Sequence, residues 1–195
     1  GNVANNELWD YLSDAFFQVA SIQTSAGFAS VNFEQWNEFA KYVLVCLMFV
    51  GGCGGSTGGG IKVIRIYSFF KILIHQVEKS YRPKVIRSIQ VGQFKIDPQQ
   101  KLGILSYVGI ILLTVAVSTG ILLVSQDQTT LVTAFTTAVS AVNNVGPGLE
   151  KVGAIENYGW YNDFGKLFIC FLMALGRLEV FAVVVIFSPQ FWRDN

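Results

Sequence analysis

The chain has 195 residues, of which 52% are hydrophobic and only 14% are charged, whereas about 25% of residues are charged in a typical soluble domain. Its formal net charge is +1 at pH 7, so charge gives no reason to expect a nucleic-acid partner. This composition argues against an ordinary soluble domain and favours an integral membrane protein.

The first two long apolar segments, Tyr42–Val50 and Ile61–His75, are separated by GGCGGSTGGG at residues 51–60. Glycine weakens helices and strands alike, so this stretch is predicted to be irregular. Even residues 36–50 are too few to cross a bilayer, which predicts a helix that breaks inside the membrane. Irregular backbone at that depth must be buried in protein or face water. The spacing excludes a phosphate-binding loop, because Ile61 stands between the last glycine and the lysine.

Basic residues are concentrated after this stretch. Nine of the 14 lysines and arginines lie between Lys62 and Lys101. Short basic loops stay on the cytoplasmic side, so residues 76–101 are predicted to be a cytoplasmic connector. Residues 1–38, 125–128 and 149–163 are then expected outside.

Three further segments complete the chain. Leu102–Val124 is uncharged over 23 residues, long enough to span a membrane. Thr129–Val142 is uncharged but would cover only about 21 Å as a helix, and glycine and proline follow it directly. Residues 167–187 are apolar except for Arg177 and Glu179. With the connector inside, residues 129–148 must enter and leave on the outer side, as a re-entrant loop.

The same unit occurs twice. Asp14–Ser30 aligns without gaps to Thr133–Leu149, and CLMFVGG at 46–52 matches CFLMALGR at 170–177 after a six-residue insertion. Such an internal repeat sets the architecture. The short strands TSAGF (24–28) and NNVGP (143–147) carry no acid or base, so neutral oxygens must hold any cation there. Backbone carbonyls directed at one axis can replace an ion's hydration shell.

TSAGF, NNVGPG, GGCGGSTGGGIK and LGRLEVF together resemble the last two pore repeats of the Trk/Ktr/HKT superfamily of potassium transporters, above all its bacterial TrkH-type membrane subunit. The resemblance implies an all-α integral membrane protein of repeated helix–re-entrant pore loop–helix units around a potassium-channel-like pore. It divides the chain into a third-type repeat (1–75, with a pore helix at Leu8–Gln23), the connector (76–101) and a fourth-type repeat (102–195).

By position, the resemblance implies a potassium filter made of backbone carbonyls. Its residues are Thr24, Ser25, Ala26 and Gly27 in the first segment, and Asn143, Asn144, Val145 and Gly146 in the second.

In this family the glycine-rich loop blocks the cavity below the filter and moves aside to open it. The resemblance therefore implies a gate comprising Gly51, Gly52, Gly54, Gly55, Ser56, Thr57, Gly58, Gly59, Gly60 and Arg177. A charge within a membrane helix normally faces water or a partner. Arg177 is expected to project into the cavity as an electrostatic barrier; the alternative is that a neighbouring helix neutralises it.

The resemblance also implies partners and a location. The missing N-terminal repeats are expected on the same polypeptide, of which this chain would be the C-terminal half, in a homodimer of the bacterial inner membrane. A cytoplasmic nucleotide-binding regulatory ring of the TrkA type is implied, and Lys62, Arg65 and Ser68 would offer it a docking surface or else form a solvated face. Potassium is the expected ion, with no organic cofactor and no enzymatic activity.

Two alternatives remain open at this point. TSAGF and NNVGPG depart from the TVGYG of potassium channels, which allows a weakly selective sodium/potassium pathway, although Gly27 and Gly146 both follow the channel pattern. A membrane scaffold without transport is the other alternative, against which the repeated re-entrant loop argues.

Overall fold

The computed structural model describes residues 2–53, 55–56, 58–82, 90–91 and 94–178. These residues form a helical structure with one antiparallel pair of two-residue strands, β1 (Gln90–Val91) and β2 (Phe94–Lys95). The helices are α1 (Asn2–Gln23), α2 (Glu38–Met48), α3 (Val63–Tyr81), α4 (Pro98–Ser125), α5 (Leu131–Asn143) and α6 (Asp163–Arg177). Short 3-10 helices are η1 (Phe33–Gln35), η2 (Glu150–Val152) and η3 (Tyr158–Trp160).

Helix α4 confirms the long apolar segment predicted at 102–124 as a helix and extends it at both ends. Pro98 occupies its first turn, and Asp97 and Gln100 form a reciprocal capping box there, which fixes where the helix begins. Within the described part of the chain, α4 is the one helix long and apolar enough to cross a membrane. One side of it is buried against α5 and α6, while Leu112, Leu113 and Val117 are exposed.

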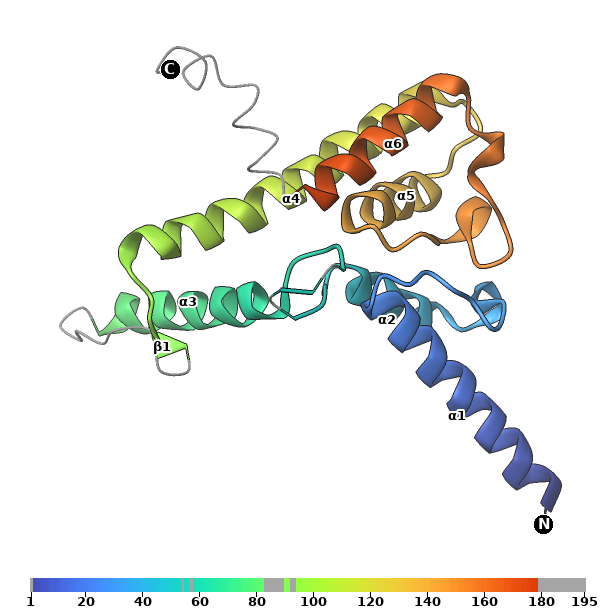
Figure 1. Ribbon diagram of the computed structural model, residues 1–195, viewed down its shortest axis with the longest axis horizontal. Helices are drawn as coiled ribbons and strands as arrows, with labels where there is room; N and C mark the ends of the chain where they lie inside the picture. Colours follow the sequence, from blue (N-terminus) through green and yellow to red (C-terminus); the bar gives the residue numbers. More distant parts are fainter. Residues whose placement is uncertain (1, 54, 57, 83–89, 92–93, 179–195) are drawn as a thin grey trace.

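Helix α5 is the short apolar helix expected near residues 129–142. It has 13 residues, and the Thr130 hydroxyl accepts a hydrogen bond from the Thr133 amide to cap its start. Figure 1 shows α4 and α6 side by side with α5 packed against both. Almost every side chain from Thr133 to Asn143 is buried, so α5 is the central element of the packing.

The break predicted after Tyr42–Val50 is confirmed. Helix α2 has 11 residues and ends at Met48, and regular helix resumes only at Val63. A bridge between Val50 and Ile61 closes the glycine-rich loop at its base, where the Gly51 amide donates to the Ile61 carbonyl at 2.9 Å. Helix α3 continues beyond His75 to Tyr81, so it includes the first residues of the predicted connector.

Helix α6 starts earlier than predicted, at Asp163, because the Asn162 side chain caps it by accepting from the Gly165 amide at 2.6 Å. It ends at Arg177, and Leu178 forms its C-cap. The predicted continuation over 179–187, including Glu179, lies outside the described residues. Helix α1 projects away from the other helices (Figure 1).

Helix α3 runs along the first half of α4 (Figure 1). The Arg65 guanidinium stacks over the Tyr107 ring at 4.2 Å, and Ser68 is buried. Of the two alternatives for Lys62, Arg65 and Ser68, the solvated face is therefore wrong for Arg65 and Ser68, because α4 covers this side of α3. The docking surface stays a prediction.

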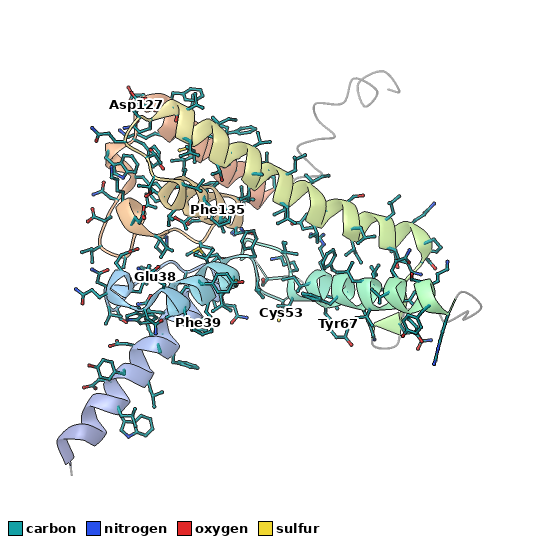
Figure 2. The ribbon with its side chains drawn as sticks, turned by 180° about the vertical axis from the view of Figure 1, so that it is seen from behind. Glu38, Phe39, Cys53, Tyr67, Asp127 and Phe135 are labelled. Atoms are coloured by element: carbon teal, nitrogen blue, oxygen red, sulfur yellow. The ribbon has the colours of Figure 1, made fainter. Side chains whose placement is uncertain are left out.

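Figure 2 shows Asp127 and Glu38 at one end of the molecule, away from the strand pair that links α3 to α4. These two acidic residues belong to segments that were expected outside, and they thus lie at the opposite end from the strands of the predicted cytoplasmic connector.

Candidate functional site

The two predicted filter segments, residues 24–27 and 143–146, have the same backbone pattern. Ser25 and Gly27 have φ of 58° and 73°, and the aligned Asn144 and Gly146 have φ of 55° and 110°. In a normal strand, successive peptide carbonyls point to alternate sides. A left-handed residue at every second position breaks this alternation. Serine and asparagine adopt this conformation only at an energetic cost, so the packing around each segment must hold it.

The hydrogen bonds of the first three positions of the two segments also correspond under the alignment made from sequence. In each, two amides and one side chain donate back to carbonyls of the preceding helix. In the first segment, Ala26 N donates to Ser21 O (2.9 Å), Ser25 N to Ile22 O (3.1 Å) and Thr24 Oγ1 to Ala20 O (2.7 Å). In the second segment, the aligned donors are Val145 N to Ser140 O (3.0 Å), Asn144 N to Ala141 O (3.2 Å) and Asn143 Nδ2 to Val139 O (2.8 Å). The fourth position differs, because the Gly27 amide donates to the Ser21 carbonyl at 3.3 Å and the Gly146 amide donates to the Ser140 hydroxyl at 3.0 Å.

These bonds leave most of the carbonyl oxygens of the segments available. No donor among the described residues bonds the carbonyls of 24–27 or 143–145. The carbonyl of Gly146 differs, because the Tyr158 hydroxyl donates to it at 2.6 Å. Burial raises the pKa of Tyr158 to about 12, so this hydroxyl stays protonated and remains a donor. Nothing in the sequence pointed to Tyr158, which lies in the short 3-10 helix η3.

The two segments meet directly. A Cβ on Gly27 would lie 2.3 Å from the Val145 carbonyl oxygen and 3.3 Å from Pro147 Cδ. A Cβ on Gly146 would lie 3.6 Å from Gly27 Cα. Only a residue without a side chain permits this approach at a positive φ, which explains the glycine in the first segment.

The glycine-rich loop packs against the first residue of each segment. A Cβ on Gly58 would lie 3.4 Å from the Thr24 carbonyl oxygen, and one on Gly59 would lie only 2.0 Å from the Asn143 carbonyl oxygen. The loop and both segments, far apart in sequence, therefore come together at one place. Of the predicted gate residues, Gly51 and Gly59 are buried and Gly52, Gly58 and Gly60 half-buried, while Gly55 and Ser56 are exposed. Gly54 and Thr57 lie outside the described residues.

Polar side-chain atoms near this contact have no hydrogen-bond partner among the described residues. Asn143 is fully buried, and its Oδ1 has no donor although its Nδ2 is satisfied. The Nδ2 of Asn144 is also buried without an acceptor. A buried acceptor without a donor is costly, so the Asn143 side-chain oxygen is an available ligand for a cation or a water molecule.

Arg177 lies beside the second segment. A Cβ on the preceding residue, Gly176, would lie 1.9 Å from the Val142 carbonyl oxygen and 2.9 Å from Asn144 Nδ2. The end of α6 thus packs backbone to backbone against the end of α5. Arg177 is exposed next to this contact, so the structure brings it to the same region as the loop and the filter segments.

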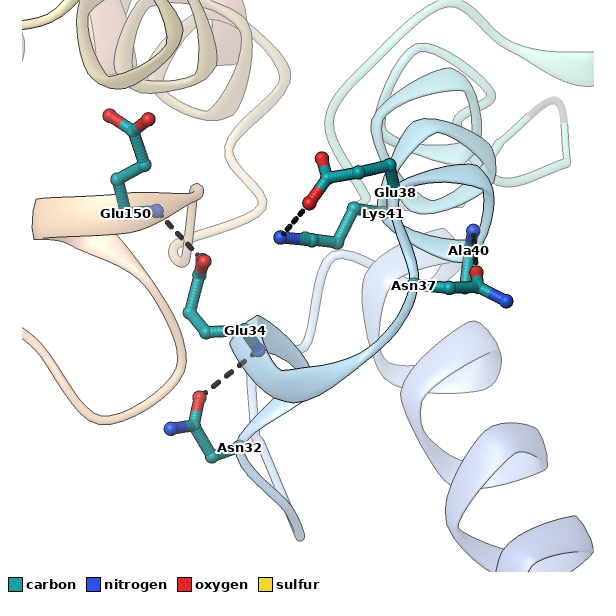
Figure 3. Close-up of polar contacts among 7 residues, drawn as sticks. All are labelled: Asn32, Glu34, Asn37, Glu38, Ala40, Lys41 and Glu150. Atoms are coloured by element: carbon teal, nitrogen blue, oxygen red, sulfur yellow. Dashed lines mark hydrogen bonds and ion pairs between the residues drawn. The ribbon is translucent and has the colours of Figure 1, made fainter.

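At the acidic end of the molecule, polar contacts join the two predicted repeats (Figure 3). Glu34 Oε1 accepts from the Glu150 amide at 2.7 Å, and Lys41 pairs with Glu38 at 2.7 Å. The Glu150 carboxylate accepts from the hydroxyls of Thr130 and Thr133. Partial burial opposes its ionisation, but these hydroxyls and the charge of Lys41 outweigh burial and hold the pKa of Glu150 below its ordinary value.

Comparison with known proteins places these features in a family. The family model of the TrkH cation transport proteins matches residues 4–194. The chain is 36% identical over 184 residues to the Trk system potassium uptake protein TrkH of Salmonella typhimurium, covering 94% of this chain and 37% of that protein. It is 31% identical over 180 residues to the Trk system potassium uptake protein TrkG of Escherichia coli, covering 92% of this chain and 36% of that protein.

Among solved structures, the potassium transporter TrkH from Vibrio parahaemolyticus superposes with a TM-score of 0.86 at 32% sequence identity. The match covers 94% of this chain and 38% of that one. This chain therefore spans little more than a third of the length of the relatives that it matches.

Proposed function

This chain belongs to the TrkH family of cation transport proteins, and we propose that it supplies two of the filter segments of a potassium uptake pathway through a membrane. The observation that carries the proposal is the contact between segments 24–27 and 143–146. Their backbones share one conformation, and their carbonyl oxygens other than that of Gly146 are available. Neutral oxygens in this arrangement can replace the hydration shell of a monovalent cation without a charged ligand. The pathway involves no covalent chemistry.

The hydrogen bonds of the peptide N–H groups in each segment support a role in cation binding. The peptide N–H groups point back to the preceding helix, where they are bonded, and so do not face a passing cation. The C-terminal ends of α1 and α5 adjoin the segments. A helix C-terminus carries partial negative charge, which favours a cation nearby.

The glycine-rich loop is proposed as the gate. It lies against the first residues of both segments, so an ion that leaves the filter on this side meets the loop. Arg177 adds a positive charge in the same region and is proposed as an electrostatic barrier to cations. Displacement of the loop would open the pathway.

Two segments cannot surround an ion, so the pathway requires two more. We propose that further repeats of the same polypeptide supply them, within a multi-pass protein of the bacterial inner membrane. Homodimerisation and regulation by a cytoplasmic nucleotide-binding ring are further proposals that rest on the resemblance described above. The names of the relatives state only that those proteins belong to a Trk system.

A weakly selective sodium/potassium pathway is the second candidate, because neither TSAGF nor NNVGPG reproduces TVGYG. The test is the reversal potential of the complete protein in liposomes under opposed potassium and sodium gradients. A value near the potassium equilibrium potential supports the first candidate. A value near zero with a robust current supports the second, and no cation current from folded protein refutes both.

A further inference from the structure

Lys62 makes contacts that neither prediction from the sequence included. It lies just after the glycine-rich loop, at the N-cap position of α3, and its side chain does not cap that helix. Instead, Nζ turns back to the loop and donates to the Ser56 carbonyl at 2.7 Å, the Gly58 carbonyl at 2.6 Å and the Ser56 hydroxyl at 3.2 Å. An ammonium group has three donors, and all three are used within the loop.

The loop needs such a contact because its own sequence provides little else. Glycine loses more conformational freedom on ordering than any other residue, and the loop has few side chains with which to pack. Among its described residues, backbone hydrogen bonds hold its base through Gly51 and Ile61, and one short turn joins Ser56 N to Cys53 O at 3.0 Å. Beyond the base, the Lys62 ammonium binds the described part of the loop.

The position of the bonded carbonyls matters. Gly58 lies against the Thr24 carbonyl, and the next residue, Gly59, lies against the Asn143 carbonyl. Lys62 therefore binds the part of the loop that contacts both filter segments. We propose that Lys62 is a positioning residue that holds the glycine-rich loop in its place under the filter, and that the loop leaves this place when the three hydrogen bonds break. The effect of Lys62 on ion flow rests on the proposed function, whereas its positioning of the loop rests only on the three hydrogen bonds described above.

The test replaces Lys62 by methionine, which is unbranched and of similar length but donates no hydrogen bond. Because the side chain of Lys62 does not cap α3, the substitution leaves the start of that helix intact. Lys71→Met is the matched control: this lysine also lies on α3 and donates to one backbone carbonyl, that of Gln90 at 2.6 Å, away from the loop. Ser56→Ala removes only the hydroxyl acceptor and should have a smaller effect than Lys62→Met.

The first readout is hydrogen–deuterium exchange of residues 51–61 in the complete protein in detergent or nanodiscs. Loss of one hydrogen bond from a charged donor corresponds to about a tenfold change in an opening equilibrium, so Lys62→Met should accelerate exchange there at least about tenfold. Lys71→Met should leave it unchanged. Unchanged exchange in Lys62→Met, or equal acceleration in both variants, overturns the proposal.

The second readout is rubidium flux in liposomes. Faster exchange together with a raised flux in Lys62→Met supports both the positioning role and the gate. Faster exchange with an unchanged flux keeps the positioning role of Lys62 and removes the gating role of the loop. The two proposals therefore fail separately.

Discussion

Substitution of Gly59 by alanine tests whether contact between the loop and the filter segments closes the pathway. The added Cβ would lie 2.0 Å from the Asn143 carbonyl oxygen, 2.7 Å from its carbonyl carbon and 2.8 Å from Asn144 Cβ. These atoms are backbone or close to it, so no flexible side chain can move aside. Gly59 has no positive φ, and alanine therefore adds a steric clash without backbone strain.

The size of the effect follows from these distances. Real Cβ atoms essentially never approach other atoms closer than 3.0 Å, so the loop and Asn143 must separate by about 1 Å. Asn143 is fully buried, its side chain is bonded to Val139, and α5 packs between α4 and α6. The loop is the softer partner and should move. Overpacking of this kind costs about 1–3 kcal/mol, which shifts an equilibrium between seated and displaced loop by about 5- to 150-fold.

The assay is rubidium or potassium uptake into liposomes that contain the complete protein, at equal amounts of folded protein. Gly59→Ala should raise the basal flux, whereas Gly58→Ala should not, because its Cβ would make an ordinary 3.4 Å contact with the Thr24 carbonyl. Gly58 also lacks a positive φ, so the two variants differ only in the clash. A Gly59→Ala flux equal to that of the wild type or of Gly58→Ala would refute the reasoning.

Three further predictions concern other parts of the site. Arg177→Gln should raise cation flux several-fold because it removes a positive charge beside the second segment; an unchanged or lowered flux in folded Arg177→Gln protein contradicts the barrier. Gly27→Ser should reduce potassium preference, measured as a reversal potential, because its Cβ would lie 2.3 Å from a filter carbonyl at a φ of +73°. The lowered pKa of Glu150 predicts that its stabilising contribution is complete above the ordinary pKa of 4.5 and is lost as pH falls through the lowered value. Glu150→Gln should therefore flatten the acid side of a melting-temperature profile, and an unchanged profile contradicts this.

Local features were predictable because they depend on residues close together in the sequence. The uncharged run at 102–124 becomes α4, the short run at 129–142 becomes α5, and the chain breaks after Met48 where glycines accumulate. The alignment of residues 14–30 with 133–149 paired Ser25 with Asn144 and Gly27 with Gly146, and the structure then gives both pairs a positive φ.

Contacts between distant residues were not predictable in the same way. The Tyr158 hydroxyl donates to the Gly146 carbonyl, and the Glu34 carboxylate accepts from the backbone amide of Glu150 across more than a hundred residues. Both depend on where the short 3-10 helices η1, η2 and η3 lie after the longer helices pack, and neither residue belongs to a periodic pattern. Lys62 shows the same limit at short range, because its spacing with Arg65 and Ser68 suggested one helical face, although its side chain turns back to the loop.

The sequence by itself determined the class of the protein, its repeat and the composition of the candidate site, because hydrophobic length and glycine placement restrict the backbone locally. Only the tertiary structure decided that Gly27 meets Val145 and that Gly59 meets Asn143. These approaches require backbones to come closer than any side chain permits, at separations set by the packing of α2, α5 and α6. A sequence records that glycine is present at such a position, but the atom that it must accommodate belongs to another segment of the fold.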